Sequence, residues 1–334
     1  MSKEIIAQNE EIVIGVDVSD AKHNIAVLNA RSEIVVQREM RAPTREKWAK
    51  FLGRFPGCAV KVIYEAGPQG YTLYDTIREF GAAAVVIAPV KTIGIKTDRR
   101  DALRIVRDFV SGSAKVITVP DRKKRVLRQL LRQRHQIRKD IVRIKNRMSA
   151  LTRFHGLVGT FRAVFTRKRD VQVLTFCFDQ QQEMCAFLEK KRDEIDALLE
   201  EVARDAEYRD DIGKLKEIKG IGALTALEIV LNVADIRAFG DAASFASYCG
   251  LCPGEWSTGA TRRLGHITRR GPGRLRGALV QCAWTAARCD PEEKKKFNEL
   301  RTRIGKKKAI VAIARRLSVR VWNKLNIREA AQAA

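Results

Sequence analysis

The order of strand-like and helix-like segments in the first third of the chain constrains the fold most. From Ile12, three β-rich runs follow one another in "IVIGVDVSDAKHNIAVLNARSEIVVQREM", separated by "SDAKHN" and "NARSE". Helix-like and strand-like segments then alternate in "TREKWAKFLGRF", "AVKVIYEAG", "YTLYDTIREFG", "AAAVVIAP" and "KTDRRDALRIVRDFV". This order indicates a mixed sheet with helices packed on it. Residues 1–120 are therefore expected to form one α/β domain.

A strongly basic segment with coiled-coil spacing follows Pro120. Residues 121–154 contain thirteen lysines and arginines, and only two acidic residues, Asp121 and Asp140. Steps of three and four, typical of a coiled-coil seam, join positions 127, 130, 134, 137, 141, 144, 148 and 151. A second seam joins Met184, Leu188, Lys191, Ile195, Leu198 and Val202. Residues 121–210 should form a helical hairpin or a dimerising pair, whose basic surface is either simply solvated or tracks phosphates.

The remaining residues, 211–334, are expected to be mainly helical. In "KLKEIKGIGALTALEIVLNV", two helical stretches are joined by a glycine turn that contains Lys219, Gly220 and Gly222. Such a turn can aim backbone N–H groups at a phosphate, as in a helix-hairpin-helix clamp. The alternative is a plain helix turn that needs glycine for its backbone angles. The later stretches "RLRGALVQCAWTAARC" and "KKKAIVAIARRLSVRVWNKL" are typical of amphipathic helices.

The overall charge predicts a polyanionic partner. Lysine and arginine number 64 against 39 aspartates and glutamates, which gives a net charge of +25. The sequence has neither a transmembrane-length apolar run nor a signal-peptide pattern, so a cytoplasmic location is expected. Seven scattered cysteines suggest reduced thiols rather than a disulfide framework. The lone "CGLC" motif at 249–252 would need two more zinc ligands, for which His266 with Cys282 or Cys289 is a loose candidate set.

Four carboxylates are candidates for a metal site. Asp17 lies inside the apolar run "IVIGVDV", where an ionised side chain needs a cation or strong donors. Glu65 ends a second apolar strand, and Asp98 and Asp101 share one face at the start of a helix. Oxygen ligands from separate elements suit Mg²⁺, with Mn²⁺ as an alternative ion. Each acid also has an ordinary interpretation as a cap, a loop residue or an ion-pair partner, and Asp20 is expected to be a turn residue.

Five motifs in order carry a family resemblance: "GVDVSDAKH", "YEAGPQGY", "KTDRRDA", "IKGIG" and "YCGLCPGEWSTG". They resemble transposases of the insertion-sequence one-ten family, which are related to pilin-gene invertases. The resemblance implies a RuvC-like, RNase H-fold domain with a DEDD metal tetrad, a coiled coil and a C-terminal transposase domain with a nucleophilic serine. Matched by position, the tetrad falls on Asp17, Glu65, Asp98 and Asp101, and the serine is Ser257. One departure is that Cys252 and Trp256 lie in a loop that varies among relatives.

The resemblance also implies partners. Members of this family recombine donor and target DNA, some under the guidance of a bridge RNA, and they assemble as homodimers that pair into a tetramer. In a bacterial cell, such a protein is expected in the cytoplasm, in association with the nucleoid. Base pairing would then select the sequence, while basic side chains hold the nucleic-acid backbones. Together with the KGIG turn, the expected contacts are Arg262, Arg263, Arg269, Arg270 and Arg274.

A serine hydroxyl needs an activator, because it is a weak nucleophile. Of the four histidines only His266 is close in sequence, so metal bound by the carboxylates is the better candidate. Thr258 and Ser247 are rival hydroxyls. We expect Ser257 to attack a DNA phosphodiester and form a covalent phosphoserine. Two alternatives stay open: a metal-dependent nuclease of the junction-resolvase kind in which Ser257 is structural, and a non-enzymatic architectural protein.

Overall fold

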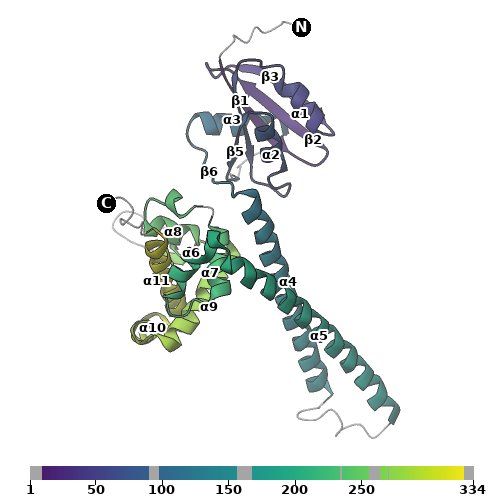
Figure 1. The fold of residues 1–334 in the computed structure, drawn as a ribbon, viewed down its shortest axis with the longest axis vertical. Helices are drawn as coiled ribbons and strands as arrows, with labels where there is room; N and C mark the ends of the chain where they lie inside the picture. The colour runs from purple at the N-terminus through teal and green to yellow at the C-terminus, as the bar shows by residue number, and fades with distance from the viewer. Residues whose placement is uncertain are drawn as a thin grey trace. The chain divides into compact units, whose positions relative to one another are not determined.

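The computed structural model describes residues 10–89, 98–155, 168–233, 235–255, 264–269 and 271–326, with the side chains of 98–100, 168–171 and 264 left out. The chain divides into two compact units, Met1–Val119 and Pro120–Ala334, and each is described by itself (Figure 1). A further division of the second unit near residue 210 stays a prediction. None of the described helices is long and apolar enough to cross a membrane.

A mixed sheet forms the centre of the first unit, as the sequence predicted. Its described strands are β1 (Glu11–Val18), β2 (Lys22–Leu28), β3 (Ile34–Arg41), β4 (Ala59–Glu65), β5 (Ala83–Ile87) and β6 (Val116–Ile117), in the order β3-β2-β1-β4-β5-β6. β1 runs parallel to β4, and β4 runs parallel to β5. The β1–β2, β2–β3 and β5–β6 pairs are antiparallel. The short strand β6 carries too few residues to show a periodic pattern in the sequence.

Helices cover both faces of this sheet. α1 (Arg45–Leu52) and α2 (Thr72–Glu79) bury Trp48, Phe51 and Ile77 in a core with β1 residues such as Ile14 and Val16. α3 (Asp98–Val110) packs on the opposite face through Ala102, Ile105 and Val106. Side chains alternate between the faces of a strand, so successive residues of β1 and β4 belong to different cores.

The second unit is almost entirely helical in its described part. Its elements are α4 (Arg122–Phe154), α5 (Lys168–Arg204), α6 (Ala206–Lys216), α7 (Ala223–Asn232), η1 (Ile236–Ala238), α8 (Ala242–Tyr248), β7 (Pro253–Glu255), β8 (Leu264–Ile267), α9 (Gly273–Cys289), α10 (Pro291–Ile304) and α11 (Lys306–Asn326). Apolar residues of α6, α7, α8, α9 and α11 form one core, which also receives the start of α4 and the end of α5. The two helices expected on either side of the KGIG turn are present as α6 and α7.

α4 and α5 form a long antiparallel hairpin, as the first seam predicted (Figure 1). Ile141 and Ile144 of α4 are buried against Cys185 of α5, and the guanidinium of Arg134 pairs with Asp196. The register predicted for the second seam was wrong at two positions: Met184 is 48% exposed and Leu198 is 52% exposed. Cys185, next to Met184, and Leu199, next to Leu198, are buried instead, because the buried stripe of α5 is offset by one residue there.

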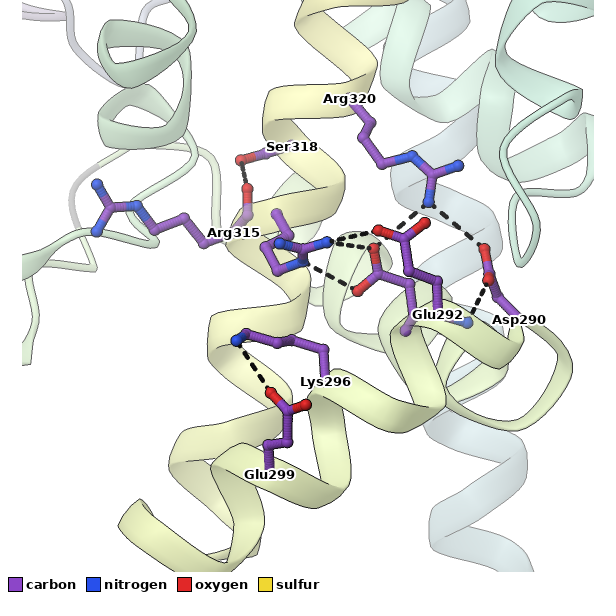
Figure 2. A network of polar contacts seen from close by, with 9 residues as sticks. Asp290, Glu292, Lys296, Glu299, Arg315, Ser318 and Arg320 are labelled. Carbon is purple, nitrogen blue, oxygen red and sulfur yellow. Dashed lines mark hydrogen bonds and ion pairs between the residues drawn. The ribbon is translucent and has the colours of Figure 1, made fainter.

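An ion-pair network joins α10 to α11 (Figure 2). The carboxylate of Glu293 is fully buried and accepts hydrogen bonds from Arg316 at 3.2 Å and from Arg320 at 3.4 Å. Arg320 also lies 3.5 Å from Asp290, whose side chain caps the start of α10. A buried carboxylate requires such partners, and here they connect α10 to α11.

Candidate active site

β1 and β4 place Asp17 and Glu65 at the same edge of the sheet. The parallel register pairs Val16 with Tyr64, so Asp17 and Glu65 are the next residues on adjacent strands. Val16 and Tyr64 both pack toward α1 and α2. Because side chains alternate, Asp17 and Glu65 project from the other face, which α3 covers. Asp17 is half-buried there, at the end of a run of fully buried residues.

α3 brings Asp101 of the KTDRRDA motif to this face. The helix begins at Asp98, whose side chain lies outside the described part of the structure, and Asp101 follows one turn later. α3 approaches β1 very closely at Gly15: a Cβ atom there would lie 2.8 Å from the Cβ of Val106 and closer still to the carbonyl oxygen of Ala102. Glycine at position 15 therefore allows the helix that carries Asp101 to lie directly on the strand that carries Asp17.

Arg104 connects two of these carboxylates. Its Nη2 donates a hydrogen bond to Oε1 of Glu65 at 2.7 Å, and its Nε lies 3.7 Å from Oδ1 of Asp101. Its Nη1 donates to Asp108 at 3.2 Å. Burial lowers the pKa of Arg104, but the three carboxylates outweigh burial and raise the pKa above its ordinary value. The sequence analysis missed Arg104, although its spacing of three residues after Asp101 and four before Asp108 is a usable signal.

The donor set fits a divalent cation. Carboxylate oxygens from β1, β4 and α3 are the hard ligands that Mg²⁺ and Mn²⁺ take. The guanidinium of Arg104 already pairs with Glu65 and lies beside Asp101, so positive charge is accommodated between these two acids. Among the side chains that the structure describes, no group of three or more acidic, histidine or cysteine residues is arranged to hold a metal ion. Asp20 lies outside this arrangement, since it is exposed and accepts a hydrogen bond from Gln69 at 3.3 Å.

The glycine turn between α6 and α7 has two different glycines. Gly220 has a φ of +101°, and a Cβ there would lie 2.7 Å from the carbonyl oxygen of Cys282 in α9. Gly222 caps α7, and no atom lies within 4 Å of the position of a Cβ. Gly220 therefore serves helix packing, whereas the backbone at Gly222 is open to an approaching group. Lys219 between the two buried isoleucines of the turn is exposed.

A basic cluster is formed by residues of α4 and α9, namely Arg132, Arg134, Arg138, Lys139 and Arg274. Burial, Lys139 and the three nearest arginines lower the pKa of His135, and burial together with Arg132 lowers the pKa of Arg274. Burial raises the pKa of Glu228, which lies near Arg134, Arg138 and Arg274. Positive groups gathered in one place are stabilised by a bound polyanion, so this cluster is suited to phosphates.

The loop predicted to carry the nucleophile lies between β7 and β8. These strands pair antiparallel, with Pro253 opposite Ile267 and Glu255 opposite Leu264. Ser257, Thr258, Arg262, Arg263 and Arg270 lie outside the described residues. Arg269 is exposed, with a positive φ of 54°. Burial raises the pKa of Cys249 in the CGLC motif to about 12, which leaves this cysteine a neutral thiol at ordinary pH.

Two family profiles match the chain. A profile of IS110-type DEDD transposases, described as transposase, matches residues 14–155, a stretch that includes most of the sheet and all of α3. A second profile, described as transposase of the IS116/IS110/IS902 family, matches residues 213–298. Together the two matches span more than half of the chain. The first match contains the four carboxylates, and the second contains β7 and β8.

Full-length relatives carry the same description. The transposase of insertion sequence element IS1533 from Leptospira borgpetersenii is 24% identical over 337 residues, which cover 94% of this chain and 95% of the relative. The transposase of element IS1111A from Coxiella burnetii is 24% identical, with 95% of this chain and 90% of the relative covered. The Sinorhizobium fredii protein y4qE, also named as a transposase, is 28% identical over 84% of this chain and 73% of its own length.

The α/β unit with its acidic sheet edge, followed by a helical unit, defines the class of this protein as a DNA transposase, an enzyme that cuts and rejoins DNA. Within that class, the chain belongs to the IS110 family of transposases. The first unit fits an RNase H-like fold, and a divalent metal is the cofactor that a DEDD-type domain suggests.

Proposed function

We propose that this transposase breaks and rejoins DNA strands through a covalent bond to Ser257, with Asp17, Glu65, Asp98 and Asp101 acting as a carboxylate site for a divalent metal. The observation that carries the proposal is the arrangement of Asp17 and Glu65 on adjacent parallel strands, on the face covered by the helix that bears Asp101. The profile that matches this stretch is named for four such acids. We also propose that the first unit has the RuvC-like form of the RNase H-like fold.

In the proposed reaction, the hydroxyl oxygen of Ser257 attacks the phosphorus of a DNA phosphodiester. One phosphorus–oxygen ester bond of the DNA breaks, a phosphoserine ester forms, and the leaving DNA oxygen takes up the proton. A DNA hydroxyl then attacks the phosphoserine, which restores a phosphodiester and frees the serine. A metal held by the carboxylates would supply electrostatic stabilisation to the charged phosphate. The four acids hold and orient that ion, while arginines neutralise the remaining phosphate charge.

Basic side chains of the second unit support binding of nucleic-acid backbones. They are the basic cluster of Arg132, Arg134, Arg138, Lys139 and Arg274, and the exposed Lys219. Contacts of this kind bind a backbone without selecting its sequence. We therefore propose that base pairing to a guide RNA selects the DNA, and that the predicted contacts at Gly222, Arg262, Arg263, Arg269 and Arg270 add to the same backbone binding.

Exposed apolar side chains on the α4–α5 hairpin support self-association. Val142 is 56% exposed, Phe154 85%, Phe176 66% and Phe187 59%. Large apolar residues spread along a two-helix hairpin favour packing against a second hairpin. We propose that a homodimer forms through these helices and that dimers pair into a tetramer. Sedimentation of the wild type and of Phe176→Ser/Phe187→Ser would test the dimer, which should weaken in the double variant.

The central experiment looks for DNA attached to protein. Protein purified with RNA from cells that express the whole element is incubated with Mg²⁺ and labelled donor and target DNA, and the products are separated on a denaturing gel. A labelled species at the size of the protein, lost in Ser257→Ala and retained in Thr258→Ala, is the expected result. Prior nuclease digestion of the RNA should abolish the same species if the recombination is RNA-guided.

Matched acid variants test the metal site in the same assay. Asp17→Asn should lose the covalent species, whereas Asp20→Asn removes the same charge from an exposed turn and should retain it. Nicked DNA without any adduct, unchanged in Ser257→Ala and lost in Asp17→Asn, would instead identify a metal-dependent nuclease. Neither adduct nor nicked DNA with the wild type, together with DNA binding that both variants retain, would leave only an architectural role.

A further inference from the structure

Arg104 lies between the acids of the proposed metal site and an acid outside it. Its guanidinium reaches Glu65 on β4, Asp101 one turn earlier on α3 and Asp108 one turn later on the same helix. Glu65, Asp101 and Arg104 are each between 21% and 24% exposed, so water screens their charges only in part. A cation of the chain itself thus lies where the proposed function requires a metal ion.

The distances from the guanidinium of Arg104 to these three acids differ. Glu65 accepts a hydrogen bond of 2.7 Å, and Asp108 accepts one of 3.2 Å. The 3.7 Å from Nε to Asp101 is too long for a hydrogen bond, and the buried Nε has no acceptor among the described residues. On leaving Glu65, the guanidinium would give up the 2.7 Å hydrogen bond but keep the one to Asp108, and its Nε has no hydrogen bond to the described residues that could be lost.

We propose that Arg104 is the exchangeable counter-ion of the carboxylate site: it neutralises Glu65 and Asp101 while no divalent cation is bound, and it withdraws onto Asp108 when one binds. The proposal rests on the proposed function, since it needs Glu65 and Asp101 to be metal ligands. The withdrawal is a side-chain movement only, because Arg104 and Asp108 are four residues apart on one helix and remain neighbours without any change of the backbone.

This role makes two opposite predictions about metal affinity. Without Arg104, the acids have no internal competitor, so Arg104→Gln should bind a divalent cation more tightly, by about tenfold. Without Asp108, the guanidinium loses the acid that receives it and stays on Glu65 and Asp101. Asp108→Asn should therefore bind the cation more weakly than the wild type. A residue that merely stabilises the fold would not give changes of opposite sign in these two variants.

The experiment titrates Mn²⁺ into the full-length protein by calorimetry, after far-UV circular dichroism has shown that each variant is folded. Arg107→Gln is the matched control, since it removes the same charge from an exposed position of the same helix and should leave the affinity unchanged. Arg104→Lys keeps the positive charge but lacks the several donors of a guanidinium, so its affinity for Mn²⁺ should lie between those of the wild type and Arg104→Gln. Thermal unfolding adds a second readout: Arg104→Gln should melt earlier than the wild type without Mn²⁺, and saturating Mn²⁺ should close that gap.

Unchanged or weaker Mn²⁺ binding by Arg104→Gln would overturn the counter-ion role while leaving the metal site intact. A different result would overturn the proposed function itself. If the wild type binds no Mn²⁺, or if Asp101→Asn binds it as well as the wild type does, then the carboxylates are not the metal site. The two failures are therefore distinguishable in one series of titrations.

Discussion

Gly15 of β1 faces Val106 of α3 so closely that a Cβ atom on residue 15 would lie 2.8 Å from the Cβ of Val106. Real Cβ atoms do not approach each other to this distance, so α3 would have to move away from β1. The absence of a side chain at this one position therefore sets the separation between the strand of Asp17 and the helix of Asp101.

Gly15→Ala should destabilise the first unit by about 3 kcal/mol, since backbone as well as side-chain atoms of α3 oppose the added methyl group. It should also weaken Mn²⁺ binding, because it separates Asp101 from Glu65. Urea unfolding and calorimetric titration measure the two effects. Gly53→Ala is the control, because its Cβ would meet its nearest atom at 3.3 Å in a helical conformation. An equal loss in both variants would show that the contact with α3 is not the cause.

The two glycines of the α6–α7 turn should respond differently to alanine. Gly220→Ala forces a side chain onto a residue with φ of +101° and into the backbone of α9, and should cost about 3 kcal/mol of unfolding free energy. Gly222→Ala has open space and an ordinary φ of −88°, so its cost should be less than about 1 kcal/mol.

DNA binding separates the packing role from the phosphate role. Gly222→Ala should weaken binding of a labelled duplex several-fold at fixed salt, if the start of α7 receives a phosphate. Fluorescence anisotropy measures this, and Gly213→Ala, inside α6 with no atom near its Cβ, serves as the control. Unchanged affinity in Gly222→Ala would leave the turn a plain helix connection.

Because the carboxylate of Glu293 is buried, removing its two arginine partners should cost more unfolding free energy than removing the carboxylate itself. Replacing both Arg316 and Arg320 by alanine leaves a charge buried without a partner and should cost about 3–5 kcal/mol. Glu293→Gln should cost less, about 1–2 kcal/mol, because the two arginines are 41% and 38% exposed and can be rehydrated. Urea unfolding of the full chain compares the two, and a larger loss in Glu293→Gln would contradict this account.

The periodic parts of the fold could be predicted from the sequence. Runs of apolar residues mark β1 and β4, and their parallel order explains why Asp17 and Glu65 share one sheet edge. The position of Arg104 could not be predicted in the same way. It is one of 64 basic residues, and only the packing of α3 on the sheet brings it to Glu65, a residue 39 positions away in the sequence.

Packing also decided details that the spacing left open. α5 carries apolar residues at adjacent positions such as Leu198 and Leu199, so either could form the seam, and the helices around it select Leu199. Similarly, a glycine turn is visible in KGIG, but the sequence does not reveal that Gly220 is required by α9 whereas Gly222 is open. The role of Ser257 stays a prediction, since its residue lies outside the described part of the structure.

His23 predicts a pH dependence of stability in the first unit. The residue is 7% exposed, and its Nδ1 accepts a hydrogen bond of 3.2 Å from the indole nitrogen of Trp48. Burial lowers the pKa of His23 from 6.5 to about 4. Protonation would both charge a buried ring and remove the acceptor that Trp48 uses.

The direction of the effect follows from the proton balance. Between pH 4 and 6.5 the unfolded chain binds a proton at His23 that the folded chain does not bind, so stability rises with pH across this interval. The contribution is complete above pH 6.5, is lost as the pH falls toward 4, and amounts to about 3 kcal/mol. His23→Gln keeps an acceptor for Trp48 but does not titrate in this range. The difference in unfolding free energy between wild type and His23→Gln, measured in urea from pH 4 to 7, should therefore grow with pH and level off above 6.5. A constant difference across this interval would mean that His23 is not held neutral by the fold.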